Sequence, residues 1–241
     1  MLCFDVLVIR MIKIIKMMKM KLLACLFTGF LLASCSESDG PIEVGLIGDA
    51  TYTVTFTMNW NSQDFPTDYP SGAHFSKLIG WSHKTSSEFF KTGTMASAGI
   101  ESMAETGATD VLQSELEAKI TSSEGLQWVI GDGLSAGTGE ISVDILVNAE
   151  NPAVTLASMV APSPDWYVAI VNVNLSDTNK FVDSKTITAL VYDAGTDDGI
   201  TYTSADADSS PKAPISLFVD APLGDGNSLP TAFASVTFTK Q

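Results

Sequence analysis

The chain has 241 residues, and 28 acidic side chains against 13 basic ones give a formal net charge of −15 at pH 7. This charge argues against nucleic acid and anionic lipid headgroups as binding partners, because both repel an acidic surface, and it favours divalent cations. A chain of this length with 45% hydrophobic residues can bury one sizeable core. We therefore expect a single acidic domain.

The N-terminal residues have the pattern of an exported lipoprotein. Residues 22–33 are almost wholly apolar and follow a lysine-rich stretch, which is typical of a secretory signal and too short for a stable membrane-spanning helix. The segment ends in Leu32-Ala33-Ser34-Cys35, which resembles a bacterial lipobox. We expect a signal peptide at 1–34 and lipidation of Cys35; the alternative is an ordinary cleaved signal in which Cys35 is incidental. The predicted location is the bacterial cell envelope, in the outer membrane and exposed at the surface.

Removal of the leader makes the remaining chain more acidic. It keeps 8 basic and 27 acidic residues, a formal charge of −19, and no arginine. Cys3 and Cys25 fall in the leader and Cys35 carries the lipid, so no disulfide is expected. Residues 35–49 are polar and predict a flexible tether. Residues 50–241 then form the domain, which reaches the membrane only through the lipid anchor.

A strand pattern begins just after the tether. From Tyr52 to Met58, apolar side chains alternate with threonines, which predicts a half-buried strand. Turn-forming clusters separate several further runs of strand-forming residues. These predicted strands cover residues 141–147, 152–160, 166–175, 186–192, 215–219 and 232–240.

Helical spacing occurs only between residues 94 and 124. Apolar side chains recur at helical spacing around Ile100 and again around Leu112, and Gly107 separates the two segments. Thr109 and Asp110 are placed to cap the second helix. Because helices do not alternate with strands, a parallel α/β fold is excluded. The pattern predicts a mainly β fold, an antiparallel β-sandwich with two short inserted helices.

Few side chains of the predicted domain could carry catalysis. It has two histidines, His74 and His83, and neither lies in a metalloprotease helix motif; nucleophile-elbow and phosphate-loop motifs are also missing. We expect both histidines to be structural, hydrogen-bonded near Trp81 or Phe75. The alternative is an envelope hydrolase with one histidine in a cleft beside a serine and a carboxylate.

Two aspartate-containing turns are the main candidate site. Asp165 directly precedes a predicted strand, and a turn with Asp193, Asp197 and Asp198 directly follows another. Calcium binds six to eight oxygen ligands from flexible loops, whereas zinc prefers the histidine and cysteine that these turns lack. The pattern favours a Ca²⁺ site, although solvated turns of this kind also occur without any ion.

Several sequence blocks carry a family resemblance. In order they are YTVTFTMNW (52–60), FPTDYP (65–70), AHFSKLIGWS (73–82), ASAGI (96–100), AETG (104–107), APSPDW (161–166) and YDAGTDDG (192–199). Together they resemble the spondin N-terminal domain, the F-spondin domain of extracellular matrix proteins, over about residues 52–239.

This resemblance implies a C2-like antiparallel sandwich of about eight strands with a bound calcium ion. Carried over residue by residue, the ligands are Asp165, Asp193 and Asp197, with Asp144 as a weaker candidate. Members of the family are adhesive modules that contact matrix, integrins or microbial glycans. Animal members carry cysteines and thrombospondin repeats that this sequence lacks, and its few basic residues do not suit heparin, so integrin and heparin binding are not carried over.

The sequence thus predicts a calcium-binding, non-catalytic adhesion or recognition module on a bacterial envelope. Its expected partner is an extracellular or surface protein or glycan. An alternative is a glycan-binding module that stacks sugars on exposed tryptophans. The four candidates are Trp60, Trp81, Trp128 and Trp166. Trp60 and Trp166 are expected in the core, because sandwich cores usually bury such aromatic rings.

Overall fold

A computed structural model describes residues 48–241 of the chain. The predicted signal peptide, the lipidation site Cys35 and most of the predicted tether lie outside these residues. In the part of the chain that is described, no helix is long and apolar enough to cross a membrane.

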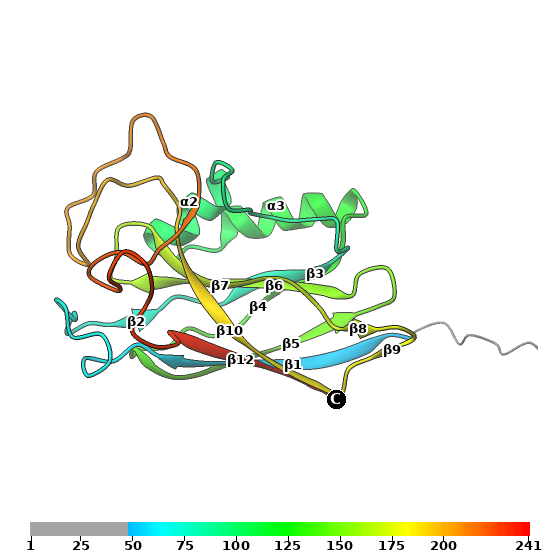
Figure 1. Cartoon of the computed structure of the whole chain (residues 1–241). Coiled ribbons are helices and arrows are strands. Elements are labelled where there is room, and N and C mark those ends of the chain that lie inside the picture. Colours follow the sequence, from blue (N-terminus) through cyan, green and yellow to red (C-terminus); the bar gives the residue numbers. More distant parts are fainter. Residues whose placement is uncertain (1–47) are drawn as a thin grey trace, which may run out of the picture. The chain divides into compact units, whose positions relative to one another are not determined.

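The described residues form two helices and a set of antiparallel strands (Figure 1). One path of hydrogen-bonded strands runs β4-β3-β6-β7-β10-β12-β1-β5, with β2 added to β6 and β11 added to β10. A short β8–β9 hairpin stands apart. The elements are β1 (Ala50–Asn59), β2 (His74–Phe75), β3 (Ile79–His83), α2 (Ala98–Thr106), α3 (Asp110–Thr121), β4 (Gly125–Ile130), β5 (Thr138–Val147), β6 (Ala153–Ala161), β7 (Trp166–Asn174), β8 (Ser176–Asp177), β9 (Lys180–Phe181), β10 (Ser184–Asp193), β11 (Ser216–Leu217) and β12 (Ala234–Lys240).

Strand β10 joins the two halves of the strand path. Its first part, Ser184–Ala189, pairs with β12, and its second part, Leu190–Asp193, pairs with β7. One strand therefore belongs to both layers, and the eight strands of the path nearly close into a barrel-like shape. This arrangement confirms the predicted mainly β antiparallel fold with two short helices.

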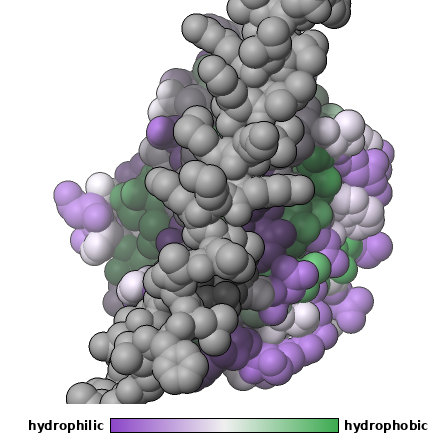
Figure 2. Space-filling view, turned by 90° about the vertical axis from the view of Figure 1, so that its right-hand side faces the viewer, coloured by the Kyte–Doolittle hydropathy of each residue, from purple (hydrophilic) through white to green (hydrophobic). Residues whose placement is uncertain are grey.

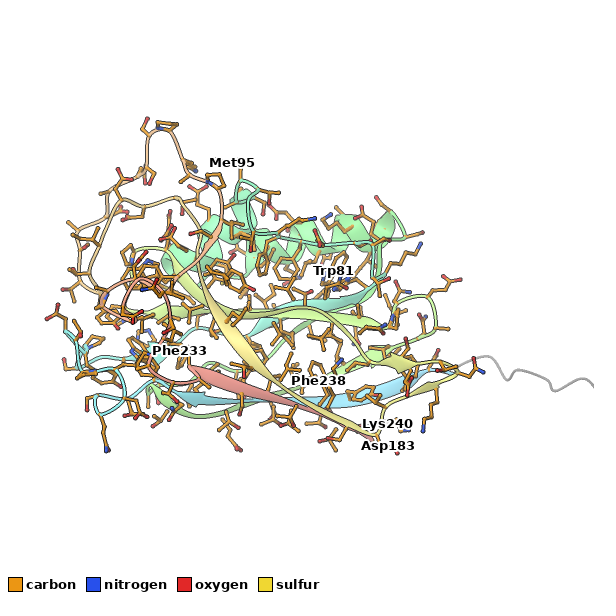
Figure 3. The ribbon with its side chains drawn as sticks, viewed as in Figure 1. Trp81, Met95, Asp183, Phe233, Phe238 and Lys240 are labelled. Carbon is orange, nitrogen blue, oxygen red and sulfur yellow. The ribbon has the colours of Figure 1, made fainter. Side chains whose placement is uncertain are left out.

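Strand β1 shows how the sequence pattern positions the core. Its apolar side chains from Tyr52 to Met58 are buried, whereas the intervening threonines face outward and bond to side chains of β5. The larger core lies between the layers and includes Phe233 and Phe238, which Figure 3 labels. Alternation with period two thus places a complete apolar face against this core.

A second buried cluster lies under the helices. Trp81 packs there with residues of α2 and α3, and the two helices lie against one side of the molecule (Figure 1). Helix α2 is capped by Ser97, whose hydroxyl accepts a hydrogen bond from the Ile100 amide. Glu115 of α3 accepts hydrogen bonds from the Ser97 hydroxyl and the Gly99 amide, which ties the two helices together. Thr109 is the N-cap residue of α3, as predicted, and Asp110 lies in the first turn, but the Thr109 side chain makes no capping hydrogen bond.

Six strands differ from the sequence predictions. The short strands β2, β8 and β9 and the longer strands β3 and β4 were not predicted. Every residue of β3 is buried, so both faces of this strand are covered and no polar alternation marks it. The predicted strand at 215–219 shortens to Ser216–Leu217, because only two residues pair with β10 before the chain turns away.

The buried face of β1 can be tested by truncation. We expect Phe56→Ala, at a fully buried position, to lower the free energy of unfolding by about 3–5 kcal/mol. Thr57→Ala, on the exposed face one residue later, should change it by no more than about 0.5 kcal/mol. Urea denaturation of both variants at one pH makes the comparison. Equal losses would contradict the assigned faces of this strand.

Candidate metal site

The predicted aspartates lie on loops at one end of the sandwich. Asp165 ends the loop between β6 and β7, and Asp193 is the last residue of β10. Register brings them together, because Asp193 pairs with Trp166, the neighbour of Asp165. Asp197 lies a few residues further, in the long loop from 194 to 215 that precedes β11.

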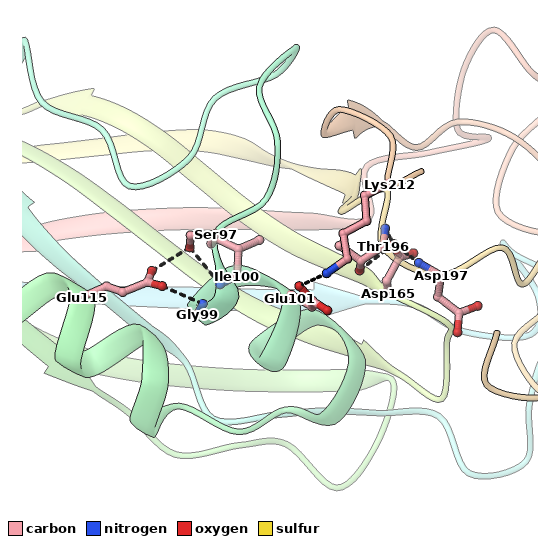
Figure 4. A network of polar contacts seen from close by, with 9 residues as sticks. All are labelled: Ser97, Gly99, Ile100, Glu101, Glu115, Asp165, Thr196, Asp197 and Lys212. Carbon is pink, nitrogen blue, oxygen red and sulfur yellow. Dashed lines mark hydrogen bonds and ion pairs between the residues drawn. The ribbon is translucent and has the colours of Figure 1, made fainter. Parts of the chain in front are cut away.

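Asp165 fastens the two loops together (Figure 4). It is fully buried, and its Oδ2 accepts hydrogen bonds from the Thr196 amide at 2.7 Å, the Thr196 hydroxyl at 3.2 Å and the Asp197 amide at 3.2 Å. Its Oδ1 is buried without a hydrogen-bond partner among residues 48–241. Burial raises the pKa of Asp165, and the bonds from residues 196 and 197 oppose this rise.

Asp193 is the second carboxylate of the site. Its Oδ1 accepts a hydrogen bond from the Gly195 amide at 2.7 Å. Burial raises the pKa of Asp193 to about 6, and the nearby charge of Asp165 adds to the rise. Two carboxylates with raised pKa values therefore lie near one another. A cation between them would lower the cost of ionising both.

Asp197 has a different role in this structure. It is almost fully buried, and its two oxygens accept hydrogen bonds from the Gly199 amide at 2.7 Å and the Ala207 amide at 2.8 Å. Both oxygens are thus engaged by backbone donors across the loop. The carboxylate shapes the long loop, and its own amide holds that loop to Asp165.

Asp144 lies away from these residues. It is exposed in the middle of β5, opposite Thr53 of β1, whose hydroxyl donates to it at 2.7 Å. Strand β5 ends the strand path on the side away from β7 and β10. The structure therefore does not bring Asp144 to the loops that hold Asp165 and Asp193.

Sequence reasoning missed a further acidic residue, Glu105 of α2. Its Oε1 is buried without a hydrogen-bond partner among the described residues. Burial raises the pKa of Glu105; the Thr196 hydroxyl opposes the rise, and the charges of Glu101 and Asp165 add to it. Glu105 follows Glu101 by four residues on one helix, and this spacing is the signal that could have indicated a paired acidic face.

A lysine offsets part of this negative charge. Lys212, in the loop before β11, forms an ion pair with Glu101 of α2 (Figure 4). Both side chains are partly exposed, so the pair contributes little to stability in water. It nevertheless connects the long loop to the helix that carries Glu105.

The donor set fits a hard cation only in part. Asp165 Oδ1 is an unsatisfied, buried carboxylate oxygen near the Asp193 carboxylate, and carboxylate oxygens are ligands that calcium prefers. However, no group of three Asp, Glu, His or Cys side chains within residues 48–241 is gathered closely enough to hold a metal ion as it stands. Ion binding would therefore need backbone carbonyls, water or a small movement of side chains.

The histidines and tryptophans lie elsewhere. His83 is fully buried, stacks on Trp81 and bonds to the Lys84 carbonyl and the Thr155 hydroxyl, as expected for a structural histidine. His74 is exposed, and its ring contacts the Gly72 carbonyl. Neither ring bonds to a serine and a carboxylate among the described residues, so the arrangement that a hydrolase would need is not found there.

The proposed platform of exposed tryptophans is not formed. Trp60, Trp81 and Trp166 are fully buried, and Trp128 is half-buried. The expectation that Trp60 and Trp166 belong to the core is confirmed. A stacking surface would need two or more exposed rings on one face, so the tryptophan-based glycan-binding alternative loses its basis.

Comparison with known proteins identifies the family. The Spondin_N family model matches residues 50–223. The chain belongs to the spondin N-terminal family. It is 30% identical to human Spondin-2 over 159 residues, which is 64% of this chain and 48% of that protein. It is also 30% identical to bovine Spondin-1 over 186 residues, which is 74% of this chain and 23% of that protein.

The matches of this spondin N-terminal domain cover only part of its relatives. The chain spans about half of the length of Spondin-2 and less than a quarter of Spondin-1. The matched residues nevertheless include both aspartate turns, at 165 and 193–197, and Glu105 of α2.

The raised pKa values of this spondin domain predict a pH dependence in the absence of divalent cations. The pKa of Asp193 is about 6 in the folded protein, against 3.8 for a free side chain. Protonation of this group therefore favours folding below about pH 4, and this stabilisation is lost as the pH rises through 6. With a chelator present, we expect the urea midpoint of Asp193→Asn to fall less between pH 5 and pH 7.5 than that of the unmodified protein.

A matched control isolates this effect. The lowered pKa of the buried His83 acts in the opposite direction, so the difference between variants is the quantity to compare. Asp144→Asn, at an exposed position, should leave the pH dependence unchanged. The assignment to Asp193 is wrong if both variants show the same slope as the unmodified protein.

Proposed function

We propose that this protein is a calcium-binding, non-catalytic adhesion or recognition module that a lipid at Cys35 holds on the bacterial cell envelope, in the outer membrane. The observation that carries the calcium proposal is the buried Asp165 Oδ1, which has no partner among residues 48–241 and lies beside a second carboxylate with a raised pKa. Leaving such an oxygen unsatisfied is costly, and a divalent cation would remove that cost.

Calcium is the cation that the donors favour. The side chains around Asp165 offer carboxylate and hydroxyl oxygens, and backbone carbonyls of the loops or water would have to complete the ligand set. A hard cation with six to eight oxygen ligands suits such loops, whereas neither histidine lies among these contacts to serve zinc. Asp165 and Asp193 would hold the ion directly. Asp197 could join them only by giving up a bond to Gly199 or Ala207.

Of the other acidic residues considered as ligands, one is left out of the proposed site and one is added to it. Asp144 is left out, because its strand is remote from β7 and β10. Glu105 is added as a supporting acid, because its buried Oε1 has no partner among residues 48–241 and the nearby charge of Asp165 contributes to its raised pKa. Bound calcium would thus link two loops and one helix at this end of the sandwich.

The recognition role is supported by family and chemistry. The named relatives are spondins, and the adhesive role that the resemblance implies suits a domain whose histidines are not set up for hydrolysis. Its acidity excludes nucleic acid as a partner. The partner would be an extracellular or surface protein or glycan, met by the loops that the cation orders.

A thermal melt tests the calcium proposal. At about 100 times the dissociation constant, calcium should add about 2.7 kcal/mol, which raises the Tm of a domain of this size by about 5–10 °C. Asp165→Asn should abolish this rise, because the amide oxygen can still accept the bonds from residues 196 and 197 while the negative charge is lost.

The control for this melt is Asp144→Asn, which should respond to calcium like the unmodified protein. Glu105→Gln should weaken the response without abolishing it. If the unmodified protein melts at the same temperature in calcium and in chelator, the calcium proposal is wrong whatever the variants do.

Recognition is tested in a separate experiment. The domain immobilised on beads should retain a specific protein or glycan from the medium around the bacterium in calcium and release it in chelator. Beads carrying Asp165→Asn should retain less of it in calcium. Equal retention on both kinds of bead would show that recognition does not depend on the proposed cation site.

A further inference from the structure

An open cleft lies between two loops at the end of the sandwich where β1 finishes. One wall is formed by residues 63–67, in the loop between β1 and β2. The other wall is formed by residues 222–225, 228 and 230, in the loop between β11 and β12. The volume of about 370 Å³ lies in the range of ligand sites and is large enough for one long side chain of a partner. We name it the loop cleft.

The walls of the loop cleft are stiff and largely apolar. Pro66 contributes to one wall, and Pro222 and Pro230 contribute to the other. Phe65 and Leu223 line the cleft and are almost fully buried in the larger core, so each wall is fixed to the body of the domain. Because proline restricts the backbone, such walls lose little conformational freedom when a ligand binds. The cleft is therefore already formed in the free protein.

One carboxylate stands on each wall. Oδ2 of Asp64 accepts hydrogen bonds from the side-chain amides of Asn61 at 2.8 Å and Asn59 at 3.3 Å. Oδ1 of Asp225 accepts hydrogen bonds from two backbone amides of its own turn, both at 2.9 Å, and these bonds hold the pKa of Asp225 below its usual range. The other oxygen of each carboxylate makes no hydrogen bond among residues 48–241. Each carboxylate is thus oriented by one oxygen and open to a partner through the other.

No basic side chain neutralises these two charges within the described chain. The loop cleft has no basic residue in its lining, and the ion pairs among residues 48–241 involve neither Asp64 nor Asp225. The opposite end of the sandwich differs, because Lys240 pairs there with Asp183 at 2.6 Å (Figure 3). Figure 2 faces that opposite end, where hydrophilic residues form much of the visible outline. The charge of the loop cleft is therefore left for a cationic ligand to match.

We propose that the loop cleft binds an arginine side chain of an extracellular protein or peptide. This rests on the recognition role proposed above and names the chemistry of its partner. The aliphatic part of arginine packs along the proline walls, while the guanidinium reaches the open oxygens of Asp64 and Asp225. Its five N–H donors lie in one plane and can serve acceptors on two walls at once, whereas the ammonium of lysine is more strongly hydrated. A neutral glycan would leave both carboxylates unmatched.

The loop cleft adjoins the proposed cation site without sharing its ligands. Asp220, two residues before Pro222, is close enough to Asp193 for its charge to contribute to the raised pKa of that residue. Calcium held by Asp165 and Asp193 would leave Asp64 and Asp225 unoccupied. A partner with an arginine in the cleft would therefore lie beside the cation site and meet both at once.

A titration followed by nuclear magnetic resonance tests this proposal. The ¹⁵N-labelled full chain, kept in solution by a nonionic detergent, is titrated with Nα-acetyl-arginine amide and separately with the citrulline analogue, which has the same length but no charge. We expect arginine to shift the amide signals of the two cleft walls, with a Kd at least tenfold lower than that of citrulline. The lysine analogue should bind more weakly than arginine.

Carboxylate variants provide the controls. Asp64→Asn and Asp225→Asn should each raise the Kd for arginine at least fivefold. Both keep a side-chain oxygen that can accept the present hydrogen bonds, so the loops should retain their structure. Asp144→Asn, at an exposed position on β5, should leave the Kd unchanged. Equal binding of arginine by all three variants and the unmodified protein would contradict the assignment to the cleft.

Other outcomes separate this proposal from the calcium proposal. Arginine and citrulline that bind equally, or maltotriose that shifts the same signals, would overturn the arginine site. Displacement of arginine by calcium would also overturn it, because the ion would then occupy the cleft carboxylates. Asp64→Asn should keep the full rise in Tm with calcium, so its loss of arginine binding concerns the cleft alone. A chain that binds arginine but shows no calcium response would contradict the cation site and support the cleft.

Discussion

The bond between the Asp165 carboxylate and the amides of residues 196 and 197 organises one end of this domain. The loop from 194 to 215 contains no strand of its own, so its backbone donors need partners outside regular structure. One oxygen of Asp165 satisfies two of them and the Thr196 hydroxyl. Hydrogen bonds to an ionised acceptor are about twice as strong as neutral ones. A single buried carboxylate therefore determines where the loop lies relative to the β6–β7 turn.

The same arrangement has an electrostatic cost. The charge that strengthens these bonds is buried, its second oxygen has no partner among residues 48–241, and Asp193 adds a like charge nearby. Glu105 increases the repulsion from the helix side. A domain optimised for stability alone would neutralise one of these groups, and sites that keep such a cost commonly serve binding. This cost supports the cation site that we propose.

The strands that could be predicted from the sequence are those with one face exposed to solvent. β1 was predictable because threonines alternate with buried side chains, whereas β3 is covered on both faces and carries no such mark. Asp165 and Asp193 were found because each borders a predicted strand, and pairing of those strands brings them together. Glu105 was missed because its proximity depends on how a helix packs, which local spacing does not encode.

The role of an aspartate in a loop was harder to predict than its position. Asp197 and Asp165 have the same chemistry in sequence, but two amides engage both oxygens of Asp197, whereas one oxygen of Asp165 is left without a partner in the described chain. That difference arises from backbone donors that fold in from Gly199 and Ala207. Sequence shows which acceptors exist but not which donors reach them, so a list of acidic residues overestimates the number of free ligands.

Topology also fixes where the two aspartate turns lie relative to the start of β1. Along the strand path, β10 is separated from β1 by two antiparallel pairings and β6 by four, so both strands run in the same direction as β1. Asp165 follows β6 and Asp193 ends β10, so both carboxylates fall at the end of the sandwich opposite to Ala50. Strand direction therefore brings the two turns to one end, and the pairing of β10 with β7 brings the two side chains next to each other.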